Sequence, residues 1–177
     1  YQIPALLLPG ITLVVSPLIS LMKDQVAALK SVGVPAAYIN SSLTGEQIRT
    51  VYARTRKGAY KLIYVAPERL ETSSFLSLMQ EMNVSFLAVD EAHCISQWGQ
   101  DFRPSYLGIA DFVNALPRRP IVAAYTATAT KQGQADIRRL LQLEDPYRIV
   151  TGFDRSNLDF DVRRPKNKFS ALAALID

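Results

Sequence analysis

The chain has 177 residues, of which 49% are hydrophobic and 20% are charged, with 20 Lys plus Arg against 16 Asp plus Glu. This composition is that of a globular domain, and it excludes disordered, collagen-like and low-complexity classes. The small excess of positive charge is compatible with a nucleic-acid partner but does not by itself indicate one. The single cysteine, Cys94, excludes an internal disulfide framework and a multi-cysteine metal site within these residues.

Short apolar runs alternate with helical patterns, which predicts β-α units and a mostly parallel sheet. Apolar runs such as 3–8 and 11–15 are too short to cross a bilayer, and no secretory leader follows Tyr1. The predicted strands are 11–15, 36–39, 62–65, 86–89, 121–125 and 147–150. The predicted helices are 1–8, 17–32, 45–57, 75–82, 107–116 and 129–141. Because the strands are apolar almost throughout, we expect helices on both faces of the sheet.

Local signals support several of these boundaries. Ser16 is predicted to cap a helix with Pro17 at its first position, and Gly33 fits the end of that helix. Thr44 and Gln47 match a capping box at the start of the next helix. After Thr151 the chain changes character, and 158–162 and 169–176 look like the first strand and helix of another unit.

The sharpest local motif is Asp90-Glu91-Ala92-His93, which ends a predicted buried strand. Mg²⁺ bound to nucleotide phosphates needs a rigid oxygen ligand, which an Asp at a strand end supplies. A neighbouring Glu can accept a proton from an attacking water. Alternatively, the two acidic residues form a solvated strand end and His93 is a packed or surface histidine. For four residues taken alone, that plainer interpretation is the commoner one.

Three other segments also follow predicted strands, namely 16–25, 66–70 and 126–130. Helix N-termini and hydroxyl groups at such junctions offer hydrogen-bond donors to phosphates without reading bases. For Ser16 the simpler interpretation is helix capping, which is compatible with a phosphate contact. In type, order and position, the four segments resemble those of superfamily 2 helicases.

The segment 94–106 contains Trp98, Phe102 and Tyr106 beside Arg103. Aromatic faces next to an arginine suit stacking on unpaired bases, although such aromatics are more often buried beneath a loop. The run closely resembles the aromatic-rich loop of RecQ helicases, which in that family senses single-stranded DNA and couples it to ATP hydrolysis. The resemblance covers almost the whole chain.

The RecQ resemblance implies an α/β fold of three layers, the RecA-like fold of P-loop NTPases. Residues 1–151 would be the first, ATP-binding helicase domain, and 152–177 a linker and the start of the second. Ser156 stands where the family usually has proline.

Roles for individual residues follow from the same resemblance. Glu91 and Asp90 would be catalytic, with Asp90 holding Mg²⁺ through water. Coupling roles are implied for His93, Gln97, Thr126 and Thr128. DNA contacts are implied for Ser16, Lys23, Gln25, Pro67, Glu68, Arg69, Trp98, Phe102 and Arg103.

The implied function is a 3′-to-5′ DNA helicase of repair or recombination that uses ATP and Mg²⁺ and acts on single-stranded and duplex DNA. We expect no membrane partner and a cytoplasmic location, associated with the nucleoid if the source is bacterial. The sequence leaves the oligomeric state open. One alternative is a nucleic-acid-binding module without motor activity. Another is an RNA helicase of the same superfamily, against which the aromatic-rich loop argues.

No G-x-x-x-x-G-K-S/T run occurs in the chain. Such a loop holds the nucleotide phosphates through its backbone amides and its lysine. The resemblance places it immediately before Tyr1, so we expect a chain truncated at both ends. We also expect that the missing P-loop strand leaves a gap in the sheet or exposed strand edges.

The first prediction concerns the 177-residue chain by itself. We expect it not to hydrolyse ATP, because it has no loop to hold the phosphates. Steady-state phosphate release with and without single-stranded DNA tests this, with Glu91→Gln as the background control. Turnover that Glu91→Gln abolishes would show the prediction to be wrong.

Overall fold

Five short apolar strands form one parallel sheet in the computed structural model, which describes residues 1–98, 101–151, 162 and 164–175. The strands are β1 (Ile11–Val15), β2 (Ala36–Ile39), β3 (Leu62–Val65), β4 (Val84–Val89) and β5 (Ile121–Ala124). Their order is β2-β3-β1-β4-β5, with β1 in the centre and every pair parallel. The sheet belongs to the first of two units, 1–146, and the second unit is 147–177.

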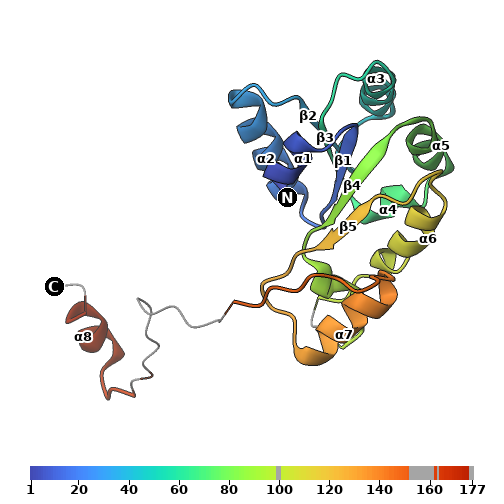
Figure 1. Ribbon diagram of the computed structural model, residues 1–177. Coiled ribbons are helices and arrows are strands. Elements are labelled where there is room, and N and C mark those ends of the chain that lie inside the picture. The colour runs from blue at the N-terminus through green and yellow to red at the C-terminus, as the bar shows by residue number, and fades with distance from the viewer. Residues whose placement is uncertain (99–100, 152–161, 163, 176–177) are drawn as a thin grey trace. The chain divides into compact units, whose positions relative to one another are not determined.

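Helices cover both faces of the sheet, as Figure 1 shows. The helices of this unit are α1 (Gln2–Leu7), α2 (Ile19–Ser31), α3 (Gly45–Arg56), α4 (Pro67–Leu70), α5 (Ser73–Glu81), α6 (Ile109–Asn114) and α7 (Lys131–Leu140). Two 3₁₀ turns, η1 (Ala92–Ile95) and η2 (Pro104–Tyr106), follow β4. Among the described residues, no helix combines the length and the apolar character needed to cross a membrane.

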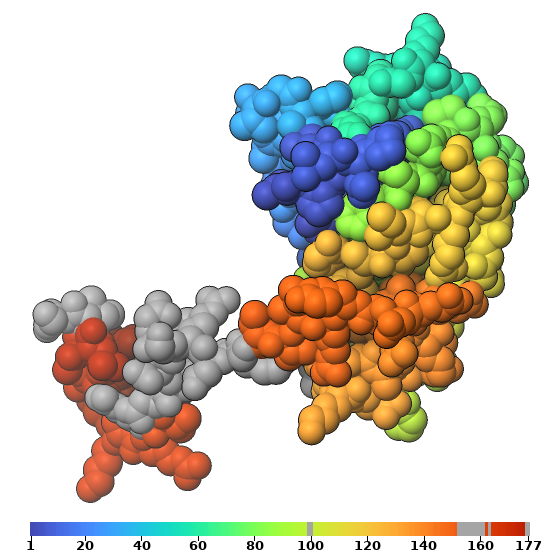
Figure 2. Space-filling view, viewed as in Figure 1, coloured from blue at the N-terminus to red at the C-terminus, as the bar shows by residue number. Residues whose placement is uncertain are grey.

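Alternate strand residues feed two separate cores, which explains the nearly continuous apolar runs. On one face, Leu13 and Val15 pack with residues of α5, α6 and α7. On the other face, Val14 and Tyr64 pack with residues of α1 and α2. Figure 2 shows α1 at the surface beside α2. The structure therefore confirms the predicted α/β fold with a parallel sheet covered on both faces.

Two local predictions are confirmed by the backbone. Thr44 and Gln47 form the expected capping box, with Gln47 N–H donating to Thr44 Oγ1 at 3.2 Å and Thr44 N–H donating to Gln47 Oε1 at 2.8 Å. Gly33, after α2, has a φ of +78°. Gly10 has a φ of +72°, and a Cβ at this position would lie 2.2 Å from the Asn83 carbonyl oxygen. Only glycine therefore fits the turn into β1.

The predicted N-cap at Ser16 is wrong. The Ser16 N–H donates to the Val65 carbonyl oxygen at 3.1 Å, so its backbone continues the β1–β3 ladder instead of turning into a helix. As a result α2 begins at Ile19, after Leu18, whose side chain makes no capping hydrogen bond. The other five predicted helices of this unit begin and end within two residues of their predicted boundaries.

The predicted strand at 147–150 is also wrong. Tyr147, Ile149 and Val150 are exposed and have no strand assignment. A β-branched run favours extended backbone, but a strand forms only where a neighbouring strand supplies hydrogen bonds. The predicted strand at 158–162 lies outside the described residues except for Val162. The second unit does contain α8 (Lys168–Ala173), where a helix was predicted.

The edge of the sheet at β5 is open. Ile121 is 58% exposed, and no β5 residue is fully buried, whereas every residue of β1 and β3 is. The five strands themselves pair without a gap. β5 therefore forms an exposed edge of the described sheet. An open edge carrying exposed apolar side chains favours association between chains.

The second prediction is that the isolated 177-residue chain is poorly stable and associates through β5. Ile121→Lys places a charge on the open edge, and we expect it to lower the apparent mass in light scattering after size-exclusion chromatography. Val32→Lys is the matched control, because Val32 is 74% exposed at the end of α2, away from this edge. A monomeric wild type with a sharp thermal transition well above physiological temperature would contradict the prediction.

Candidate functional site

The carboxyl ends of four adjacent strands lie level and bring the sequence motifs together. Val15 pairs with both Val65 and Val89, and Val89 pairs with Ala124. The residues that follow continue the ladder, with Asp90 N–H donating to the Val15 carbonyl at 2.9 Å. This edge is where ligands bind in open parallel sheets.

Asp90 is half-buried at this edge, at the end of β4. Its burial raises the pKa of the carboxyl group, whereas the hydrogen bond from Glu91 N–H and the nearby Ser16 hydroxyl lower it. Ser16 Oγ is buried and makes no hydrogen bond of normal geometry with the described residues. A partly desolvated carboxylate beside an unpartnered hydroxyl is a suitable environment for a hydrated cation.

Glu91 has left-handed backbone, with φ 47° and ψ 44°. For a non-glycine residue this conformation costs about 1–3 kcal/mol and needs support from the surrounding structure. The next residues provide it, since Ala92 N–H donates to the Tyr125 carbonyl and Cys94 N–H donates to the Glu91 carbonyl, both at 2.9 Å. The turn directs the chain from β4 into η1.

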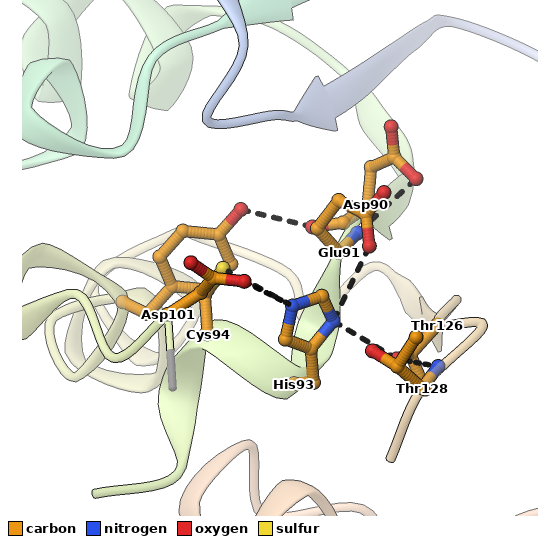
Figure 3. A network of polar contacts seen from close by, with 8 residues as sticks. Asp90, Glu91, His93, Cys94, Asp101, Thr126 and Thr128 are labelled. Carbon is orange, nitrogen blue, oxygen red and sulfur yellow. Dashed lines mark hydrogen bonds and ion pairs between the residues drawn. The ribbon is translucent and has the colours of Figure 1, made fainter. Parts of the chain in front are cut away.

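His93 connects three of the segments singled out from the sequence (Figure 3). Its Nδ1 lies 3.2 Å from Glu91 Oε2 and 3.1 Å from Thr126 Oγ1. Its Nε2 lies 3.7 Å from Asp101 Oδ2, in the aromatic-rich segment. Thr126 Oγ1 also accepts a hydrogen bond from Thr128 N–H at 3.3 Å. The structure thus brings the predicted catalytic glutamate and three of the four predicted coupling residues into one network.

The aromatics of segment 94–106 have different environments. Tyr106 is fully buried, and its hydroxyl donates to the Asp90 carbonyl at 2.9 Å. Burial raises the pKa of Tyr106 well above its usual value. Trp98 is 82% exposed and Phe102 is partly exposed. Packing therefore accounts for Tyr106, while the Trp98 ring is free to meet a ligand.

The segment also contacts the chain after β1, because Arg103 Nη1 donates to the Pro17 carbonyl at 3.4 Å. Arg103 N–H donates to the Cys94 carbonyl at 2.9 Å. These bonds hold the far end of the segment against the edge of the sheet.

The other predicted DNA-contacting residues differ in exposure. Lys23 and Glu68 are exposed on α2 and α4, whereas Pro67 is buried, as is Ser16. Gln25 accepts a hydrogen bond from Gln2 at 2.6 Å. Arg69 donates to the Asn40 carbonyl at 3.5 Å. Gln97 is exposed next to Trp98.

Two further groups near this site were not predicted from the sequence. Tyr1 contacts both Tyr64 and Tyr125, at ring-centroid distances of 6.3 and 5.4 Å, close to Asp90. Asp136 on α7 is bonded to Ser96. The only sequence signal for Asp136 is that it precedes Ile137 and lies three residues after Gly133, on the buried side of the predicted helix. In the part of the chain described, no three His, Cys, Asp or Glu side chains cluster to hold a metal ion.

The family model that matches this chain is the DEAD/DEAH box helicase family, over residues 1–137. The chain therefore belongs to that family.

Within the family, the sequence matches RecQ DNA helicases. It is 49% identical over 168 residues to the ATP-dependent DNA helicase RecQ of Bacillus subtilis (strain 168), which covers 95% of the chain. It is 45% identical over 176 residues to the RecQ of Haemophilus influenzae, which covers 99% of the chain. The chain spans 28% of the length of each of these curated relatives.

Solved structures support the fold at much lower identity. The DUF1998 helicase MrfA bound to DNA matches 80% of the chain and 20% of its own, with a TM-score of 0.60 and 14% identity. The Hef helicase domain of Pyrococcus furiosus matches 76% of the chain and 27% of its own, with a TM-score of 0.57 and 20% identity. At these identities the likeness shows the fold alone, which is the RecA-like α/β fold of these structures.

The third prediction concerns the stability cost of Asp90. Its raised pKa means that the folded state disfavours the ionised carboxylate. Asp90 therefore favours the folded state only while it is protonated, and this contribution is lost as the pH rises through the raised pKa. We expect Asp90→Asn to raise the Tm by about 2 °C at pH 7.5 and to give no gain near pH 3.5. Asp24→Asn, on the exposed side of α2, is the control. A lower Tm for Asp90→Asn at pH 7.5 would contradict this account.

Proposed function

We propose that this chain forms the first motor domain of a 3′-to-5′ DNA helicase, in which ATP hydrolysis is coupled to movement on single-stranded DNA and to duplex unwinding. The observation that carries the proposal is the contact of His93 with both Glu91 and Thr126. It links the predicted catalytic base to the segment that follows β5. Residues 1–151 would be the ATP-binding domain, and 152–177 a linker and the start of a second domain.

The residues at the sheet edge fit a hydrated Mg²⁺ bound to nucleotide phosphates. Asp90 would hold it through water. The Ser16 hydroxyl, which has no hydrogen bond of normal geometry with the residues that the structure describes, would donate to or accept from the same water shell. When bound, the ion would supply neutralisation of phosphate charge. Glu91 would orient the attacking water and accept its proton, while His93 fixes the direction of the Glu91 carboxylate.

Single-stranded DNA would be sensed by the aromatic-rich segment. The exposed Trp98 ring would stack on an unpaired base, an interaction worth about 1–3 kcal/mol. The same segment reaches His93 through Asp101, so a change in the segment on DNA binding would be felt at Glu91. Exposed Lys23 and partly exposed Arg69 would contact the phosphate backbone. A role in repair or recombination and a DNA-associated location follow from this proposal.

A second function suits the 177-residue chain by itself, namely nucleic-acid binding without motor activity. The absence of a G-x-x-x-x-G-K-S/T run favours it. It predicts single-strand binding that weakens with salt and does not respond to nucleotide. The RNA-helicase alternative is disfavoured by the similarity to RecQ DNA helicases.

The fourth prediction tests the proposal in the full-length protein that contains these residues. We expect single-stranded DNA to stimulate ATP hydrolysis strongly and Trp98→Ala to remove most of the stimulation. Glu91→Gln should lower turnover about 100-fold or more. Steady-state phosphate release measures all three. Glu68→Ala, which changes an exposed side chain on α4, is a comparison variant at a predicted DNA-contacting position.

Two results would contradict the proposal. Hydrolysis that does not respond to DNA would leave only an ATPase. Stimulation unaffected by Trp98→Ala would leave the aromatic-rich segment with a packing role alone.

A further inference from the structure

A buried carboxylate on α7 holds the base of the aromatic-rich segment. Asp136 Oδ2 accepts a hydrogen bond from Ser96 Oγ at 2.8 Å. The Asp136 side chain is 6% exposed, and Ser96, which directly follows η1, is 2% exposed. The two residues are 40 positions apart, so the bond is a tertiary contact between two separate elements.

The carboxylate of Asp136 is well supplied with donors. Arg139 Nη2 lies 3.0 Å from Oδ1, and Gln132 Nε2 donates to the same oxygen at 3.5 Å. The hydrogen bond from Ser96, followed by that from Arg139, lowers the pKa of Asp136. A buried charge of this kind is tolerated only when its oxygens are bonded, and loss of one partner leaves an unsatisfied group.

Ser96 extends the contact toward Trp98. Its Oγ also accepts from Trp98 N–H, at 3.4 Å. A continuous series of bonds therefore runs from Asp136 through Ser96 to the backbone of the exposed Trp98. Ser96 N–H also donates to the His93 carbonyl oxygen at 3.1 Å, so Ser96 is bonded both to Asp136 and to the backbone of His93.

At its N-terminus, α7 is joined to the segment that follows β5. The helix begins at Lys131, and Thr130 caps it by accepting a hydrogen bond from Gly133 N–H at 3.1 Å. Thr126 and Thr128 lie within five residues of that start. Ala129 and Ile137 pack in the same core as Ile95 of η1. Because a helix of ten residues moves as a unit, a displacement at Asp136 reaches its N-terminus.

We propose that Asp136 is a positioning residue that transmits DNA occupancy at Trp98, through Ser96 and α7, to the Thr126–Thr128 segment. This route does not use the contacts of the His93 ring with Glu91 and Thr126. It rests on the proposed function, since it requires hydrolysis that responds to DNA. A purely structural role for the bond would lower stability without changing the ratio of DNA-stimulated to DNA-free turnover.

The fifth prediction is tested in the full-length protein with Ser96→Ala, Asp136→Ala and the double variant. We expect each to lower kcat at saturating single-stranded DNA about tenfold, with DNA-free kcat and the KM for ATP within about twofold of wild type. The double variant should resemble the single variants, because both substitutions remove the same hydrogen bond between Ser96 and Asp136. Arg139→Ala is the matched control on α7, as it removes the 69% exposed partner and keeps the Ser96 bond.

Thermal melting of every variant accompanies the kinetics. If Asp136→Ala does not fold, Ser96→Ala decides, since it leaves the Asp136–Arg139 pair intact. If DNA stimulates hydrolysis by the wild type and Ser96→Ala keeps the full stimulation, this inference is overturned and the proposed function stands. Equal loss in Arg139→Ala would also overturn it. A wild type that does not respond to DNA would remove the proposed function and, with it, this inference.

Discussion

The parallel register of β1 with β3 and β4 is the constraint on which the site depends. Because Val15 lies level with Val65 and Val89, the backbones of Ser16 and Asp90 continue the ladder side by side. The Ser16 hydroxyl therefore meets the Asp90 carboxylate at the end of the sheet. A shift of one residue in this pairing would turn the side chains to the opposite faces and separate the two groups.

The site keeps features that work against stability. Asp90 is ionisable and partly desolvated, Ser16 Oγ has no hydrogen bond of normal geometry within the described part of the chain, and Glu91 has left-handed backbone. Each has an unfavourable free energy that the rest of the domain must offset. Such features gather at functional sites because a bound ligand can satisfy polar groups that the protein's own residues leave without partners.

The aromatic-rich segment combines anchored and free residues. Tyr106 packs in the core and bonds to the Asp90 carbonyl, Arg103 bonds to Pro17, and Ser96 bonds to Asp136. Between these anchors, Trp98 remains exposed. The segment can therefore present a ring to a ligand while its ends stay attached to both β4 and α7, which is the arrangement that a sensor requires.

The sequence by itself determined the positions of the five strands of the sheet to within two residues, the capping box at Thr44 and the candidate pair Asp90 and Glu91, because apolar runs and turn residues act over a few neighbouring positions. It also indicated the RecQ family through motifs whose order is visible in one chain. It did not determine that Ser16 continues a strand, that 147–150 forms none, or that Asp136 bonds to Ser96. Only the tertiary structure decided these, because each depends on a partner distant in sequence, which local propensity does not specify.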